Sequence, residues 1–339
     1  MKKKVLIFLA LLVTVQLFSG CAFLRQTEGS SVAPAPSQAE KRSAWVAYWA
    51  VDDAMAEVAD LGDSLESLLY FGAYFDAQDR LFIPDAIVQF KAQVERTYGA
   101  ASPGPAYLTF INDKLLAQGG SSLKDTALLY TLLETPDARR AHIADILALT
   151  EGGGYDGVEI DYEAMRRDMV LWEHFINFIT ELTEQTQQRG LLLRVVLEPG
   201  IPYEALVFPE GPEYVIMCYN LHGPGSEPGP KADDAFLLEL VKKTANLPGR
   251  RHFALATGGF EWVGTSVTTL SQKEAFALSR QEKAAPQRDA DSQAVSFAYR
   301  GPDGVVHQVW YADAITLTHW MSLIRGAGDF GITLWRLCG

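Results

Sequence analysis

Basic residues are scarce in this chain of 339 residues, with 29 Lys and Arg against 42 Asp and Glu, a formal net charge of −13. A surface this acidic repels polyanions, which argues against nucleic acid as a partner. Cysteine is also scarce, and apart from Cys21 the chain holds only Cys218 and Cys338. A single pair would be no disulfide framework, so we expect both thiols to be free.

Long apolar runs are absent beyond the first twenty residues. The run at residues 5–17 follows Lys2, Lys3 and Lys4 and is too short to span a membrane, so residues 1–20 are predicted to be a secretory signal peptide. The small residues before Cys21 resemble a bacterial lipobox. The resemblance implies lipid on the Cys21 thiol and a protein exported to the bacterial cell envelope and held at its membrane. The alternative is an ordinary signal peptide followed by a chance cysteine.

The rest of the chain reads as a tether followed by one folded unit. Lipidated Cys21 and residues up to 42, rich in Ser, Ala and Pro, are predicted to form a flexible linker. From 43 to 339, short apolar runs alternate with helical patterns, which is typical of a parallel sheet with crossover helices. Strands are predicted at 45–51, 68–75, 106–112, 157–163, 191–197, 214–220, 252–259 and 331–335, and helices at 85–98, 136–150, 168–189, 232–246 and 313–327.

Eight strands with intervening helices predict an α/β fold, the (β/α)₈ TIM barrel. One segment interrupts the alternation, at about residues 264–310. It contains a helical stretch, a polar run and two β-rich runs joined by the turn sequence GPDG at 301–304. We expect a small α+β insertion between strands seven and eight.

The strongest chemical signal is the run DGVEIDYE at residues 156–163. On a strand, Glu159, Asp161 and Glu163 share one face, while the apolar residues between them share the other. Like charges this close raise one another's pKa, which is costly in a core but useful for acid–base catalysis. No histidine lies within ten positions to complete a metal site, so we expect neither metal nor cofactor. The less specific alternatives are a metal-lining strand or a solvated edge.

These residues resemble the DxxDxDxE signature of glycoside hydrolase family 18, the chitinase-like enzymes. Met217-Cys218-Tyr219-Asn220 resembles the family's sixth-strand Met-x-Tyr-Asp, and the stretch ending at Trp335 resembles its eighth strand. The pattern is most similar to bacterial enzymes that act on wall or spore-cortex peptidoglycan. The resemblance implies a glycosidase for β-1,4-linked glycans containing N-acetylglucosamine, of peptidoglycan or chitin type.

The family mechanism is retaining, and the substrate's own acetamido group is the nucleophile. By resemblance, Glu163 is the catalytic acid and base, and Asp161 holds the acetamido group and stabilises the charge that develops on it. Tyr219 donates its hydroxyl to the acetamido carbonyl oxygen.

The resemblance also assigns supporting positions. Trp335 is the floor of the sugar site, Asn220 and Met217 are substrate contacts, and Asp156 and Glu159 are a supporting acid relay. Glu159 and Asn220 stand where the family more often has Asp.

Two other functions stay open on the sequence. The first is a catalytically inactive chitinase-like lipoprotein that only binds sugar, although such relatives usually lack the terminal glutamate that Glu163 provides here. The second is a lipid-anchored solute receptor, which has two α/β lobes rather than eight evenly spread strands.

Overall fold

The computed structural model describes residues 41–99, 103–116 and 120–339. The predicted signal peptide, Cys21 and all but the last two residues of the predicted linker lie outside the described residues. None of the helices in these three ranges combines the length and the apolar character that a membrane crossing requires.

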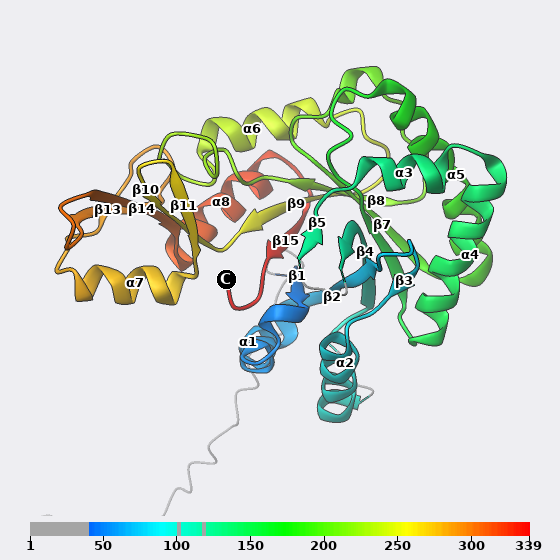
Figure 1. Cartoon of the computed structure of the whole chain (residues 1–339), viewed down its shortest axis with the longest axis horizontal. Coiled ribbons are helices and arrows are strands. Elements are labelled where there is room, and N and C mark those ends of the chain that lie inside the picture. The colour runs from blue at the N-terminus through cyan, green and yellow to red at the C-terminus, as the bar shows by residue number, and fades with distance from the viewer. Residues whose placement is uncertain (1–40, 100–102, 117–119) are drawn as a thin grey trace, which may run out of the picture. The chain divides into compact units, whose positions relative to one another are not determined.

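Eight parallel strands close into a barrel, as predicted (Figure 1). Each strand pairs with the next along the chain, and the last pairs with the first, which closes the sheet. The strands are β1 (Arg42–Ala47), β2 (Leu65–Phe75), β4 (Ala106–Leu115), β6 (Gly157–Asp161), β7 (Leu192–Leu197), β8 (Glu213–Met217), β9 (Arg251–Ala256) and β15 (Gly331–Trp335). The short strands β3 (Leu81–Phe82) and β5 (Ser121–Ser122) extend β2 and β4 at the C-terminal end of the barrel.

Helices cover the outside of the barrel and connect most successive strands (Figure 1). Thr135 caps α4 and Pro136 occupies its first turn, while Gly190 ends α5 in the left-handed conformation at φ 68°. Between β7 and β8 the described chain has only a short 3-10 turn, η5 (Tyr203–Ala205). The α-helices around the barrel are α1 (Ala54–Leu61), α2 (Asp85–Tyr98), α3 (Thr126–Leu133), α4 (Pro136–Gly152), α5 (Met169–Arg189), α6 (Asp234–Lys243) and α8 (Ala314–Ala327).

An α+β insertion lies between β9 and α8, as predicted. Its antiparallel sheet has the order β11 (Ser266–Leu270), β10 (Gly258–Val263), β14 (Val306–Ala312), β13 (Val295–Arg300) and β12 (Gln287–Arg288). Helix α7 (Gln272–Gln281) packs on this sheet through Ala275, which shares a buried cluster with Phe297 and Val309. The sheet begins a few residues before the predicted segment because β10 and β11 form a hairpin of their own.

The barrel strands have two faces with different cores. The outward face packs under the helices and includes Val158 and Ile160 of β6. The inward face is a separate cluster with Trp45, Phe71 and Met217 among its members. Since side chains alternate along a strand, polar residues placed between these outward-facing apolar residues are directed into the barrel.

Candidate active site

Two carboxylates of the acidic run face the barrel interior from β6. Glu159 is fully buried and Asp161 is 4% exposed, and both alternate with the outward-facing Val158 and Ile160. This alternation confirms the predicted faces. The strand ends at Asp161, so Glu163 stands two residues further on, in the loop at the C-terminal end of the barrel rather than on the strand as predicted.

The main chain of Glu163 is held by one buried amide. The Glu163 N–H donates to Oδ1 of Asn112 (3.0 Å), and Nδ2 of Asn112 donates to the Glu163 carbonyl (3.1 Å). Asn112 lies on β4 and is completely buried. The backbone at Glu163 is therefore fixed to the neighbouring strand, and its half-buried side chain extends from a fixed point.

Burial sets the electrostatics of the two acids. Burial, followed by the charge of Glu163, raises the pKa of Asp161 well above its usual range. Burial also raises the pKa of Glu163, against the opposing charge of Lys124. In addition, Oδ1 of Asp161 is buried and has no hydrogen-bond partner among the described residues. The pair therefore keeps a proton to higher pH than isolated carboxyl groups would, and Oδ1 of Asp161 remains an acceptor that a ligand could use.

A lysine contacts the carboxylate of Glu163. Lys124 follows β5, and its ammonium forms an ion pair with Glu163 and lies 3.9 Å from Oδ1 of Asp113. Its own backbone N–H donates to the same Asp113 oxygen (2.7 Å). Glu198, just after β7, accepts a hydrogen bond from the Ala164 N–H (2.8 Å), beside Glu163.

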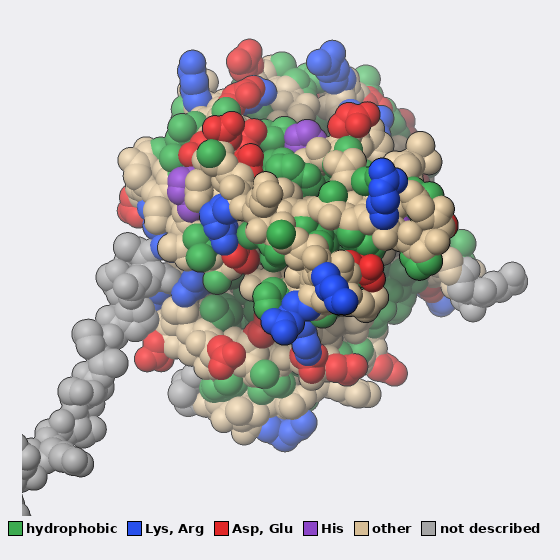
Figure 2. All heavy atoms as spheres, turned by 90° about the vertical axis from the view of Figure 1, so that its left-hand side faces the viewer, with side chains coloured by type: hydrophobic (Ala, Val, Ile, Leu, Met, Phe, Trp, Pro, Cys, Tyr) green, Lys and Arg blue, Asp and Glu red, His purple; other side chains and the backbone are tan. Residues whose placement is uncertain are grey.

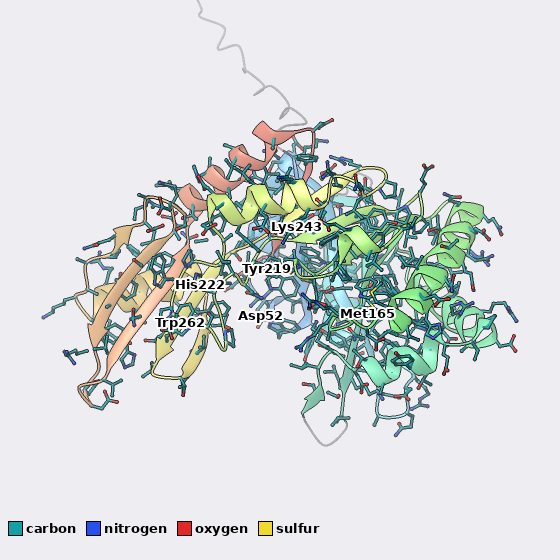
Figure 3. The ribbon with its side chains drawn as sticks, turned by 90° about the horizontal axis from the view of Figure 1, so that it is seen from above. Asp52, Met165, Tyr219, His222, Lys243 and Trp262 are labelled. Atoms are coloured by element: carbon teal, nitrogen blue, oxygen red, sulfur yellow. The ribbon has the colours of Figure 1, made fainter. Side chains whose placement is uncertain are left out.

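Tyr219 lies near both acids, two residues beyond the end of β8. Burial, with the charges of Asp161 and Glu163, raises its pKa well above the usual range, so the phenol keeps its proton and remains a donor. Figure 3 shows Tyr219 between Trp262 of the insertion and Met165 of the loop after β6.

Tyr74 of β2 is a second buried phenol near Asp161. Its hydroxyl has no hydrogen-bond partner among the described side chains.

The remaining predicted contacts surround this centre. Trp335 ends β15 half-buried, edge-on to Trp45 (5.6 Å between ring centroids) and to Phe71 (4.7 Å). Met217 is buried in the inner cluster next to Tyr219. Asn220 is exposed, with a left-handed backbone at φ 62°, so its amide stands at the solvent side rather than within the buried centre.

The acid relay of Asp156 and Glu159 stays a prediction, and the structure gives the contacts of both carboxylates. Both oxygens of Glu159 are occupied, by Trp45 Nε1 (2.6 Å), Thr109 Oγ1 (2.8 Å) and Arg194 Nε (2.8 Å). Three donors, one of them a guanidinium, hold this carboxylate in place. Asp156 precedes β6 at the opposite end of the barrel, where Oδ2 accepts from the Ala106 N–H (2.8 Å).

The sequence prediction missed Asn112, Asp113, Lys124 and Glu198. Asn112, Asp113 and Glu198 are polar residues at the C-terminal ends of predicted strands, where barrel active sites are built, and that position was the available signal. Lys124 lies in a loop with no pattern around it, and only the folded chain brings it to Glu163.

Comparisons with known proteins show which family the chain resembles. The family model for glycosyl hydrolases family 18 matches residues 113–339. The chain is 28% identical to YdhD of Bacillus subtilis (strain 168), over 66% of this chain and 56% of that protein. The name of YdhD describes it as a sporulation-specific glycosylase. It is 25% identical to the cortical fragment-lytic enzyme of the same organism, over 61% of this chain and 52% of that protein.

A solved structure shows the same fold. The chitinase of Chromobacterium violaceum superposes with a TM-score of 0.71 at 19% identity, covering 87% of this chain and 94% of that one. The chain spans about half the length of the curated relatives it matches. The barrel, the acidic run on β6 and the match over residues 113–339 lead to one conclusion: the chain belongs to glycosyl hydrolases family 18.

Proposed function

We propose that this chain is a retaining glycosidase that cleaves β-1,4-linked glycans containing N-acetylglucosamine, and that its substrate is peptidoglycan. The observation that carries the proposal is the buried Asp161 oxygen without a partner, beside an acid whose pKa is raised by burial. A buried acceptor is costly unless a ligand donates to it, and the N–H of a sugar's acetamido group is such a donor.

The described side chains fit the substrate-assisted reaction of the family. Asp161 accepts the acetamido N–H, and Tyr219 donates to the acetamido carbonyl oxygen. That oxygen forms a bond to C1 as the bond from C1 to the glycosidic oxygen breaks, and Glu163 gives its proton to the leaving oxygen.

Water completes the reaction. It attacks C1, its proton goes to Glu163, and the acetamido oxygen is released, so the configuration at C1 is retained. Asp161 and the Tyr219 hydroxyl stabilise the charge on the transient ring.

The choice of peptidoglycan rests on similarity. One relative is named a cortical fragment-lytic enzyme, and the family resemblance already favours enzymes of the bacterial wall. Figure 2 views the molecule from the side of the insertion and shows acidic and basic side chains mixed over that face. Because both signs of charge are mixed on this face, it has no strong electrostatic field of one sign that would disfavour a neutral or weakly charged polysaccharide.

Release of reducing ends from N-acetylglucosamine oligomers and from purified peptidoglycan tests the proposal. We expect Glu163→Gln to lower kcat by about 10²- to 10⁴-fold, because the amide cannot donate a proton to the leaving oxygen. Glu184→Gln, the same change at an exposed position on α5, is the control and should keep wild-type activity. Full activity in Glu163→Gln would show that another residue is the acid.

The acetamido group gives a second readout. Deacetylated glycans should react poorly, since they lack the nucleophile. Equal turnover of acetylated and deacetylated glycans would contradict the mechanism, and binding without any hydrolysis would make the protein a sugar-binding member of the family.

A further inference from the structure

Lys124 occupies an unexpected place for a cation. Its side chain is 29% exposed and forms an ion pair with Glu163, the group that has to give up a proton. Among the described residues, no other Lys or Arg pairs with Glu163. The backbone of Lys124 is left-handed, at φ 55°, a conformation that costs free energy in a residue with a Cβ and that the Asp113 hydrogen bond to its N–H helps to hold.

The ion pair opposes the first chemical step. An ammonium beside Glu163 favours its ionised form, whereas protonation of the glycosidic oxygen needs the neutral acid. A substrate that brought its own anion to Lys124 would remove this opposition. Lys124 would then remain charged and paired with the substrate, and Glu163 would take a proton from solvent, so the overall charge balances.

Sugar chemistry places such an anion next to the scissile bond. In a β-1,4-linked glycan the oxygen that Glu163 protonates is O4 of the leaving sugar, and O3 is on the adjacent ring carbon. In a muramic acid residue O3 carries a lactyl ether whose carboxylate carbon is two bonds from O3. A group within ion-pair distance of Glu163 is therefore within reach of that carboxylate.

We propose that Lys124 binds the carboxylate of a 3-O-lactyl group on the leaving sugar, an inference that rests on the function proposed above. The site thereby distinguishes the bond between N-acetylglucosamine and muramic acid from a chitin bond, where O3 is a hydroxyl. The carboxylate must be free, since an amide to a stem peptide removes its charge. A reaction that hydrolyses that amide would therefore supply the preferred substrate.

Three soluble glycans test Lys124: N-acetylglucosamine oligomers, N-acetylglucosamine–muramic acid oligomers with free lactyl carboxylates, and the latter with those carboxylates converted to primary amides. For wild type we expect kcat/KM roughly ten- to hundred-fold higher on the free carboxylate than on the amide. Lys124→Met should abolish this ratio, and Lys124→Arg should keep most of it. Lys243→Met is the control, because Lys243 is half-exposed on α6 and pairs only with Glu239 among the described residues (Figure 3).

A pH profile separates this role from a structural one. Glu163 is faced by Asp161 from β6, Asp113 from β4, Glu198 after β7, Tyr219 after β8 and Lys124. On the neutral oligomer, kcat/KM falls with rising pH as Glu163 ionises. Loss of Lys124 raises the pKa of Glu163, so in Lys124→Met the fall should move to higher pH.

The outcomes are distinct. A wild type without preference for the free carboxylate, or a Lys124→Met variant that keeps the preference, overturns the inference. Binding of the same glycans is measured by calorimetry as well. If wild type hydrolyses none of them, the proposed function fails, while a carboxylate preference in binding that Lys124→Met loses would still support the site.

Discussion

Glu159 illustrates how a single buried charge is accommodated in the barrel. Its carboxylate accepts from Trp45, Thr109 and Arg194, and Arg194 in turn donates to Thr333 Oγ1 (2.9 Å) on β15. Both members of the ion pair are essentially inaccessible to solvent. Glu159 is thus fully engaged by these donors, and Asp161 is left as the inward carboxylate of β6 with an oxygen that has no partner among the described residues.

Removal of one member of this buried pair should be strongly destabilising. We expect Glu159→Ala to lower the free energy of unfolding by about 3–5 kcal/mol, because Arg194 would remain buried and charged without this partner. Denaturant unfolding measures the change, with Glu159→Gln as a milder variant that keeps hydrogen-bonding capacity. A Glu159→Ala protein of wild-type stability with an altered pH–rate profile would instead support the predicted acid relay.

At the scale of elements, the sequence predicted the barrel strands and most of the helices. Helix α2 and the start of α4 are where the periodicity and Pro136 placed them. The missed helices α1 and α3 have only eight residues each, which is too short for a repeating apolar spacing. Strand ends were also misjudged: β6 stops at Asp161 and β8 at Met217, because pairing with neighbours, which the sequence does not display, decides where a strand ends.

The site shows the same limit. Glu163, Asp161 and Tyr219 could be predicted because they belong to short local motifs. The contacts of Lys124 and Asn112 with Glu163 span 39 and 51 positions of the chain, and no local pattern encodes them.

The insertion sheet depends on one close approach. A Cβ on Gly259 of β10 would lie 1.9 Å from the Trp310 carbonyl oxygen of β14, inside any allowed contact. We expect Gly259→Ala to separate these strands and to destabilise the insertion by more than 1 kcal/mol, visible as faster amide hydrogen exchange in β10, β13 and β14 than in the barrel strands. Unchanged exchange would mean that the sheet shifts to accept the methyl. Gly264→Ala, where no atom lies within 4 Å but φ is 60°, separates backbone strain from collision.

Over the whole molecule, one buried cation links three parts of the fold. Lys231, in the loop after β8, donates to the carbonyl of Thr257 after β9 (2.9 Å) and lies 4.7 Å from the ring centroid of Phe260 on β10. Burial, with a smaller effect from Arg336, lowers its pKa to about 8. None of the described carboxylates lies within ion-pair distance of it.

This arrangement predicts how stability changes with pH. The unfolded chain holds the Lys231 proton up to a pKa of 10.5, so between pH 8 and 10.5 the unfolded state binds more protons than the native state. The free energy of unfolding should therefore rise with pH in that window, by about 2 kcal/mol between pH 7 and 10, relative to Lys231→Met. Urea unfolding of both proteins across this range measures the difference, and a constant difference would show that Lys231 titrates normally.

The two cysteines of the folded unit are free, as predicted, and their settings determine how the protein meets an oxidant. Cys218 is inaccessible beneath the helices, and burial raises the pKa of its thiol far above the usual range. Burial raises the pKa of Cys338 to about 11, which leaves about one thiolate in ten thousand at pH 7. Because peroxides and alkylating agents attack the thiolate, both thiols should remain unmodified in an oxidising compartment without the protection of a disulfide.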